Sequence, residues 1–385
     1  MTTCLFGTYV RAHSANRLLR LALAGGGFAV TECHEPLWEE TADKGGRYFG
    51  ALSLARLAAR YVRAARQLAQ RWRGLSKEPP PLVVVGFGGQ LDVLLARRLC
   101  RPRAGLVFAP LVSLTETLVD DRKLFRPRGA VGRALAALDR AALRAADLIL
   151  ADTAAHADYL GELGASQVAV WHLGVEPEFL PRPPVVPVAR RVLFYGRYLP
   201  LHGVDTIVEA AARLGARADV VLIGCGPERP RIEALARVRG ASVTFRDEVP
   251  LAALSAELAS ASVVLGVFGA GRKAAMVVPN KVYQAAACGR PLVTRDGPGL
   301  REVLRPGDHC LVCPPADPAA LATAISTLLD DARLAERMGH AARVHLLERF
   351  APEQQAEHLG ALLAERLGIA PPAPPSVEAA RARVT

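Results

Sequence analysis

The sequence VPNKVYQAAACGRP, residues 278–291, predicts a helix between two buried strands and decides the fold expected for the second half of the chain. The apolar run 262–268 precedes the helix and is predicted to be one strand. The apolar segment 291–294 follows the helix and is predicted to be the other. Pro279 suits the first turn of a helix, where its missing N–H is not needed. Gly289 suits the left-handed position that ends a helix. This order of strand, helix and strand is typical of a parallel α/β sheet.

The loop before this helix is basic and contains glycine. It carries Gly271, Arg272 and Lys273, and Lys281 follows in the first turn of the helix. A helix N-terminus offers free N–H groups and the positive end of the helix dipole. Loop and helix together therefore predict a phosphate-binding site. The alternative is a surface helix whose Lys281 and Arg290 are solvated.

The composition indicates a large globular protein. The 385 residues are enough for two domains, and 51% of them are hydrophobic, which excludes global disorder. No stretch is long and apolar enough to span a membrane, and the N-terminal residues do not resemble a signal peptide. We therefore expect a cytoplasmic protein, either free or peripheral on the inner face of the membrane.

The cysteines and the charge say less about function. The seven cysteines are scattered, which favours reduced thiols. Cys310 and Cys313 form a CxxC pattern, but they lie in a predicted strand with no second pair, so we expect no metal there. The net charge of +11 is compatible with nucleic acid, an anionic membrane or a phosphorylated substrate. No nucleic-acid-binding module is recognisable, so nucleic acid is not expected as a partner.

Residues 1–180 are predicted to hold about six strands that alternate with helices. The first strand runs into Gly7 and Thr8, where a glycine lets a ligand approach the backbone or merely makes a tight turn. The polar segment 109–123 is predicted to be a loop at the carboxyl end of a strand. Open α/β sheets bind their ligands at such places.

One long helix is predicted over Ala51–Arg73. Its apolar residues recur at helical spacing, and Arg56, Arg60, Arg63 and Arg66 fall on another face. The whole segment carries six arginines and no acid. One interpretation is a packed helix with a solvated arginine face. The other is a surface that meets acidic lipid headgroups or a lipid-diphosphate acceptor.

The alternation of predicted strands and helices begins again after a proline-rich segment. We expect an N-terminal domain at 1–180, a linker at 181–187 and a second α/β domain at 188–350. A C-terminal helix is expected within 351–368, and a disordered tail at 369–385.

Several motifs of the second half occur in an order and spacing that resemble the glycosyltransferases of group 1 (family 4), which have the GT-B fold. The motifs are Gly196-Arg197, Pro200–Gly203, Gly224-x-Gly226-Pro227, Pro279–Gln284, Gly289-Arg-Pro291, Glu302 and Pro315–Pro318. In the first half, Asp152-Thr153-x-x-His156 and Gly174-Val175 also resemble segments of these enzymes.

The resemblance implies an α/β protein in which two Rossmann-like, doubly wound domains face each other across a cleft. The C-terminal helix is expected to cross back to the first domain. The implied function is transfer of a sugar from a nucleotide-sugar donor to a sugar or lipid-linked acceptor. The resemblance further implies a retaining reaction that needs no metal and no cofactor.

The resemblance also implies roles for individual residues. Arg197 and Lys281 are expected to be catalytic, because they would neutralise the diphosphate leaving group as charge builds on it. The residues expected to bind substrate are Gly7, Thr8, His202, Gly224, Gly226, Gly271, Arg272, Lys273, Asn280 and Gln284.

Some positions depart from the family pattern. The family usually has two glutamates eight positions apart, and Met276 and Gln284 stand there in this chain. His202 stands where a lysine is common, and Ala109 where many members have a histidine. No catalytic base is therefore named. A non-catalytic protein that binds a nucleotide-sugar is the alternative function.

Overall fold

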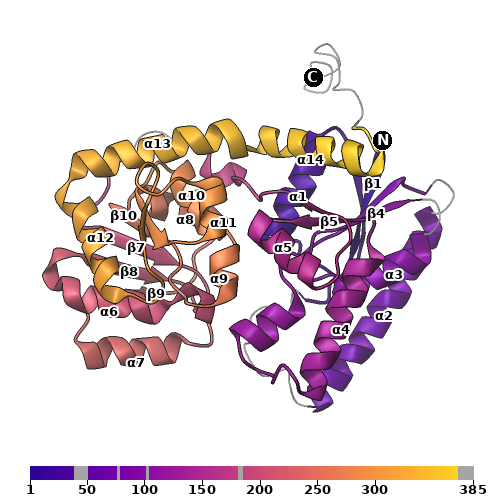
Figure 1. Ribbon diagram of the computed structural model, residues 1–385, viewed down its shortest axis with the longest axis horizontal. Coiled ribbons are helices and arrows are strands. Elements are labelled where there is room, and N and C mark those ends of the chain that lie inside the picture. Colours follow the sequence, from indigo (N-terminus) through magenta and orange to yellow (C-terminus); the bar gives the residue numbers. More distant parts are fainter. Residues whose placement is uncertain (39–50, 76–78, 101–103, 181–184, 372–385) are drawn as a thin grey trace, which may run out of the picture.

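The computed structural model describes residues 1–38, 51–75, 79–100, 104–180 and 185–371. It forms two α/β lobes that lie side by side (Figure 1). The chain order of strands and helices within each lobe agrees with the predicted strand–helix alternation. Most of the predicted linker and of the predicted tail lies outside the described residues.

Each lobe is built on a six-stranded sheet in which every pairing is parallel. The first sheet contains, in spatial order, β2 (Ala29–His34), β1 (Thr2–Gly7), β3 (Leu82–Val85), β4 (Gly105–Phe108), β5 (Leu148–Ala151) and β6 (Val168–Val170). The second contains β12 (Leu311–Cys313), β11 (Leu292–Arg295), β10 (Val263–Leu265), β7 (Arg191–Tyr195), β8 (Asp219–Ile223) and β9 (Val243–Arg246). Both orders are those of a doubly wound fold, because the order in which the chain adds strands reverses once in each sheet. The reversal lies between β1 and β3 in the first sheet and between β7 and β10 in the second.

Helices cover both faces of each sheet (Figure 1). The first lobe has α1 (Ser14–Gly25), α2 (Ala51–Leu75), α3 (Gln90–Cys100), the π-helix η1 (Glu116–Asp121), α4 (Ala130–Ala145), α5 (Ala154–Glu162) and the short turn η2 (Pro177–Phe179). The second has the short turns η3 (Pro200–His202) and η4 (Gly215–Arg217) and the helices α6 (Val204–Leu214), α7 (Arg229–Arg239), α8 (Leu251–Ala259), α9 (Arg272–Met276), α10 (Asn280–Ala287), α11 (Pro298–Val303), α12 (Pro318–Asp330) and α13 (Ala332–Phe350).

The last helix, α14 (Pro352–Leu367), returns to the first lobe and packs on α1 (Figure 1). The two helices approach closely, since a Cβ at Gly25 would lie 3.0 Å from the Cβ of Ala356. Leu359 and Leu363 are buried in one apolar cluster with Leu19 of α1. The predicted crossover is confirmed.

Short elements account for the differences from prediction. The predicted loop before α10 contains α9, and the predicted polar loop 109–123 contains η1. Two further short helices, α8 and α11, were not predicted. Such short elements give too little periodicity to be recognised unless their ends carry a clear signal, as Pro279 and Gly289 do for α10.

The strand prediction for the CxxC pattern is confirmed. Cys313 lies in β12 and Cys310 immediately before it, and both are buried. They belong to different apolar clusters. All seven cysteines, which lie within the described residues, are free thiols in this structure.

Candidate active site

Lys281 lies at the point where the second sheet reverses its strand order. Its ammonium is 4.2 Å from the centre of the Phe194 ring, and the residue is only 5% exposed. Its Nζ has no hydrogen-bond partner among the described residues. Burial lowers the pKa of Lys281 to about 7. A buried cation without a partner is costly, so this environment favours an anionic ligand.

Gly196 and His202 complete this cationic pocket. Gly196 has a φ of +143°, and a Cβ there would lie 3.2 Å from both Lys281 Nζ and His202 Cε1. Only glycine leaves the backbone and the ammonium in this arrangement. Burial and the nearby Lys281 hold the pKa of His202 well below its usual range, although a hydrogen bond to the backbone of Arg197 opposes this. His202 is therefore neutral, and its Nδ1 lacks a partner among the described residues.

Arg197 follows β7 and faces the first lobe. Burial and the charge of Arg197 together lower the pKa of His13, at the start of α1, to about 4. Arg197 contacts His202 through its backbone, and His202 lies beside Lys281. The catalytic roles predicted for Arg197 and Lys281 stay predictions.

Gly224 and Gly226 pack against the backbone of the segment that follows β7. A Cβ at Gly224 would lie 2.1 Å from the carbonyl oxygen of Gly196, and one at Gly226 would lie 2.6 Å from the backbone N of Tyr198. Close contact between backbones accounts for both glycines. Their predicted contact with substrate stays a prediction.

The predicted cations of the loop before α10 contact the first lobe. The Lys273 Nζ donates a hydrogen bond to the Thr117 hydroxyl at 2.9 Å. Arg272 forms an ion pair with Glu162 at 2.8 Å. Gly271 is the residue before α9, and a Cβ there would meet nothing within 4 Å.

Gln284 and Asn280 lie on α10 with Lys281. The Gln284 amide donates to the Glu176 carboxylate and accepts from the hydroxyl of Tyr195. Its amide is thus engaged at both ends in this structure. Its predicted role toward a ribose stays a prediction, as does the role of the Asn280 backbone.

Gly7 ends β1 and Thr8 follows it, where the strand order of the first sheet reverses. The buried Asp92 accepts hydrogen bonds from the Thr8 N–H at 2.7 Å and the Thr8 hydroxyl at 2.9 Å. A Cβ at Gly7 would lie 2.5 Å from the same carboxylate. The glycine is thus required by Asp92, a partner that the sequence did not reveal.

The position of Met276 gives a structural reason for one departure from the family pattern. Its side chain is buried in an apolar cluster otherwise made of first-lobe residues, among them Phe108 and Tyr159. Its carbonyl accepts a 2.7 Å hydrogen bond from the Thr153 hydroxyl. An apolar residue at this position therefore connects the lobes.

Glu302 also joins the lobes. Its carboxylate accepts hydrogen bonds from the N–H groups of Ala154 and Ala155, at 2.7 and 3.2 Å, in the first turn of α5. His172 lies 3.3 Å from the same carboxylate. A carboxylate of one lobe thus caps a helix of the other, and no sequence pattern indicates this pairing.

A second polar group lies on the first-lobe side of the cleft. His156 Nδ1 is 2.6 Å from Asp152 Oδ1, and Glu116 of η1 lies near enough to influence the pKa of His156. The sequence marked Asp152 and His156 only as part of a resemblance, and Glu116 not at all.

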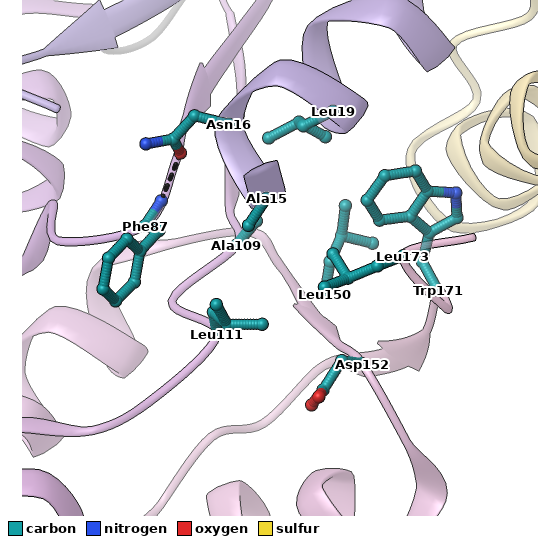
Figure 2. Close-up of a pocket in the computed structure, with 10 residues that line it drawn as sticks. All are labelled: Ala15, Asn16, Leu19, Phe87, Ala109, Leu111, Leu150, Asp152, Trp171 and Leu173. Carbon is teal, nitrogen blue, oxygen red and sulfur yellow. Dashed lines mark hydrogen bonds between the residues drawn. The ribbon is translucent and has the colours of Figure 1, made fainter. Parts of the chain in front are cut away.

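A recess beside Asp152 has about 300 Å³ of empty volume, part of it open to solvent (Figure 2). Apart from Asn16 and Asp152, its ten lining residues are apolar. Asn16 bonds to the Phe87 N–H at 2.8 Å. Figure 2 shows the Asp152 carboxylate at one edge, turned away from Leu19 and Asn16.

The second lobe carries the family signature. Residues 189–331 match the family model for glycosyl transferases group 1. They form a group 1 glycosyltransferase domain. This glycosyltransferase domain contains the whole cationic pocket, including Arg197, His202 and Lys281.

Relatives agree with this assignment. Over 158 residues, the chain is 32% identical to an alpha-D-kanosaminyltransferase from Streptomyces kanamyceticus, covering 38% of each chain. The chain spans about half or less of the length of the curated relatives that it matches.

Solved structures match the fold of both lobes. Sucrose-phosphate synthase from Thermosynechococcus elongatus matches with a TM-score of 0.70 at 19% identity, covering 95% of this chain and 99% of that one. Anabaena HepE in complex with UDP and glucose matches with a TM-score of 0.66 at 16% identity, covering 94% and 99%. The two lobes, the glycosyltransferase domain and the domain before it, have the GT-B fold.

Proposed function

We propose that this chain is a glycosyltransferase that moves a sugar from a nucleotide-sugar donor to a hydroxyl of a sugar or lipid-linked acceptor. The single observation that carries the proposal is the buried ammonium of Lys281, which has no hydrogen-bond partner among the described residues and lies where the strand order of the second sheet reverses. A diphosphate is an anion that would satisfy it. The presence of UDP and glucose in the related HepE structure supports the same ligand class.

The pocket suits the departure of a diphosphate. As the bond between the sugar and the diphosphate oxygen breaks, negative charge grows on that oxygen. Lys281 and Arg197 would stabilise this charge more in the transition state than in the ground state. The acceptor oxygen forms the new bond and gives up its proton, so the products are a glycoside, a nucleoside diphosphate and a proton.

A retaining outcome and independence from metal are part of the proposal. Within the described residues, no three His, Cys, Asp or Glu side chains are grouped to hold a metal ion. Activity in the presence of a chelator, and the anomeric configuration of the product, would test these two statements directly.

Attachment to an anionic membrane surface is proposed for the exposed arginines of α2. Arg56, Arg63 and Arg66 are exposed on this helix. Among the described helices, none is long and apolar enough to cross a membrane. Co-sedimentation with vesicles that contain anionic lipid, compared with neutral vesicles, tests the attachment.

The main test is nucleotide binding followed by turnover. Thermal shift with UDP, GDP, ADP and their sugars should show stabilisation by about 2.7 kcal/mol at 100 times the dissociation constant of the true ligand. Release of nucleoside diphosphate in the presence of acceptors then measures transfer. An absence of any shift with every nucleotide would contradict the proposal.

A non-catalytic binding protein is the second candidate. The observation that favours it is that Gln284 is engaged with Glu176 and Tyr195. Such a protein would show the thermal shift but release no nucleoside diphosphate with any acceptor.

A further inference from the structure

A buried arginine, Arg295 at the end of β11, contacts the loop that leads into α9. The residue is only 9% exposed, and it forms no ion pair with a carboxylate in the described part of the chain. The neighbouring Asp296 forms its ion pair with Arg301 instead, at 2.6 Å. A buried charge without a paired counter-charge stabilises a fold poorly, because its desolvation is not offset. Stability alone therefore does not account for an arginine at this position.

The Arg295 guanidinium donates its hydrogen bonds to backbone carbonyls. Its Nη1 donates to the oxygens of Gly269 and Gly271, at 2.7 and 3.3 Å, and its Nε donates to the oxygen of Asp296 at 2.9 Å. In a trans peptide, the C=O of one residue and the N–H of the next point in opposite directions. The N–H of Ala270 therefore points away from Arg295, and it donates to no described residue.

The other polar groups of this loop are held by η3, the turn that ends at His202. The N–H of Phe268 donates to the His202 oxygen at 3.0 Å, and the N–H of Gly269 donates to the Leu201 oxygen at 3.1 Å. A Cβ at Gly269 would lie 2.6 Å from the same Leu201 oxygen, so the two backbones are in direct contact. The loop is thus held through its N–H groups by η3 and through its carbonyls by Arg295.

The loop 269–271 determines where the next charged residues lie. The helix α9 begins directly after it, and the Lys273 charge from this helix helps to lower the pKa of His202 in the cationic pocket. The Lys273 ammonium also donates to the Thr117 hydroxyl of the first lobe. A shift of the loop would therefore move Lys273 relative to both the cationic pocket and the first lobe.

Arg191 offers a comparison within the same sheet. It begins β7, at the amino edge of the sheet, and its side chain is 17% exposed. It forms an ion pair with Glu257 and donates to the Ser260 hydroxyl at 2.8 Å. Arg191 thus has the carboxylate partner that Arg295 does not have, and it contacts no part of the loop 269–271.

We propose that Arg295 is a positioning residue of the donor site, which acts by fixing the backbone of the loop 269–271 and not by touching the donor. The proposal rests on the proposed function for the identity of the ligand. The ordering of the loop that it predicts does not depend on that function.

Calorimetry on the full chain, with UDP and GDP as the probes, tests the proposal. Arg295→Met should weaken binding of the nucleotide that wild type binds by about tenfold or more. Arg295→Lys should recover only part of this loss, because one ammonium cannot replace a planar guanidinium that donates to three carbonyls. Arg191→Met is the matched control and should keep the affinity of wild type, even where it loses as much stability.

Chemical rescue separates positioning from folding. Free guanidinium, added to Arg295→Ala at concentrations far below those that unfold the protein, should occupy the space of the missing group and restore part of the nucleotide affinity. The same addition should leave the nucleotide affinity of Arg191→Ala unchanged. Rescue of neither variant, or equal rescue of both, would contradict a specific role for Arg295.

Two further outcomes of the calorimetry would overturn the proposal. One is equal nucleotide affinity in Arg295→Met and wild type. The other is full recovery in Arg295→Lys, which would mean that the charge acts and not the geometry of the guanidinium. A loss in Arg191→Met as large as that in Arg295→Met would likewise reject the proposal, because it would assign the effect to general destabilisation.

Hydrogen exchange tests the loop without a nucleotide. The Gly269 amide, which is bonded to η3, should exchange faster in Arg295→Met than in wild type and at the rate of wild type in Arg191→Met. Unchanged exchange in Arg295→Met would overturn the proposal. Failure of wild type to bind any nucleotide would instead contradict the proposed function, while the exchange measurement still decides whether Arg295 positions the loop.

Discussion

The two polar sites of the cleft differ in what they lack. Around Lys281 in the second lobe, a buried cation has no hydrogen-bonded anion among the described residues. Around Glu116 in the first lobe, buried carboxylate oxygens have no donor within the same described part of the chain. The unsatisfied atoms, more than the shape of a cavity, distinguish the two sites.

The largest effect should come from removing the cation. Lys281→Met should weaken nucleoside diphosphate binding by about 100-fold or more, since a charge-assisted contact with the phosphates is lost. The same change should stabilise the free protein by about 1–3 kcal/mol, because it removes a buried charge without a partner. Calorimetry and chemical denaturation measure the two effects.

Lys123→Met, at an exposed lysine of the first lobe, is the control and should change neither quantity. Unchanged nucleotide affinity in Lys281→Met would remove the contrast between the two sites. A loss of both binding and stability would show that Lys281 has a partner in solution.

The contrast also requires the two lobes to face each other as they do here. Met276→Ala should destabilise the protein by about 2–3 kcal/mol, because it leaves a cavity in a cluster made mainly by the other lobe. Met276→Leu, which keeps the volume, should cost less than about 1.5 kcal/mol. Equal stabilities of the two variants in urea denaturation would show that this contact is absent in solution.

The pH dependence of donor binding should report Lys281 directly. With a pKa of about 7 in the free protein, Lys281 loses its charge as the pH rises above 7, and a bound diphosphate would hold the proton. Affinity should therefore fall by up to about tenfold per pH unit above 7. Below pH 6, where Lys281 is already charged, the pH dependence that Lys281 causes should disappear.

Proton uptake offers the check. Calorimetry at pH 8 in two buffers of different ionisation enthalpy should show up to one proton taken up on binding. Binding without proton uptake would mean that Lys281 is already charged in the free protein, or does not meet the phosphates.

The smallest effect is expected at the contact between Glu302 and α5. Glu302→Gln should cost about 1 kcal/mol, since the N–H groups of Ala154 and Ala155 lose a charged acceptor but keep a neutral one. Hydrogen exchange at those two amides should accelerate. Exchange at wild-type rates would indicate that the lobes stand apart in solution.

The fold was largely predictable, because it depends on repeated local patterns. The alternation of strands and helices and the position of Gly289 after α10 both follow from short-range preferences. The C-terminal crossover came from the resemblance instead. The cationic pocket was partly predictable, because Lys281 stands in a recognisable motif.

What could not be predicted depends on contacts between distant residues, several of them across the lobes, and on irregular backbone. Nothing near Met276 in the sequence shows that its side chain enters the other lobe, and nothing near Glu302 shows that it caps α5. Glu116 lies in a π-helix whose backbone geometry leaves no periodic signal. Asp92 was missed because its partner Thr8 is 84 positions away in the sequence.

The return of α14 to α1 has a consequence for synthesis on the ribosome. Leu359 and Leu363 fill part of the core of the first lobe, yet they leave the ribosome after the entire second lobe. At the usual 5–20 residues per second, the first lobe waits roughly 10–35 s with its α1 face uncovered. The domain that is made first is thus completed last, and a nascent chain that stops before residue 352 presents an apolar groove that a chaperone could occupy.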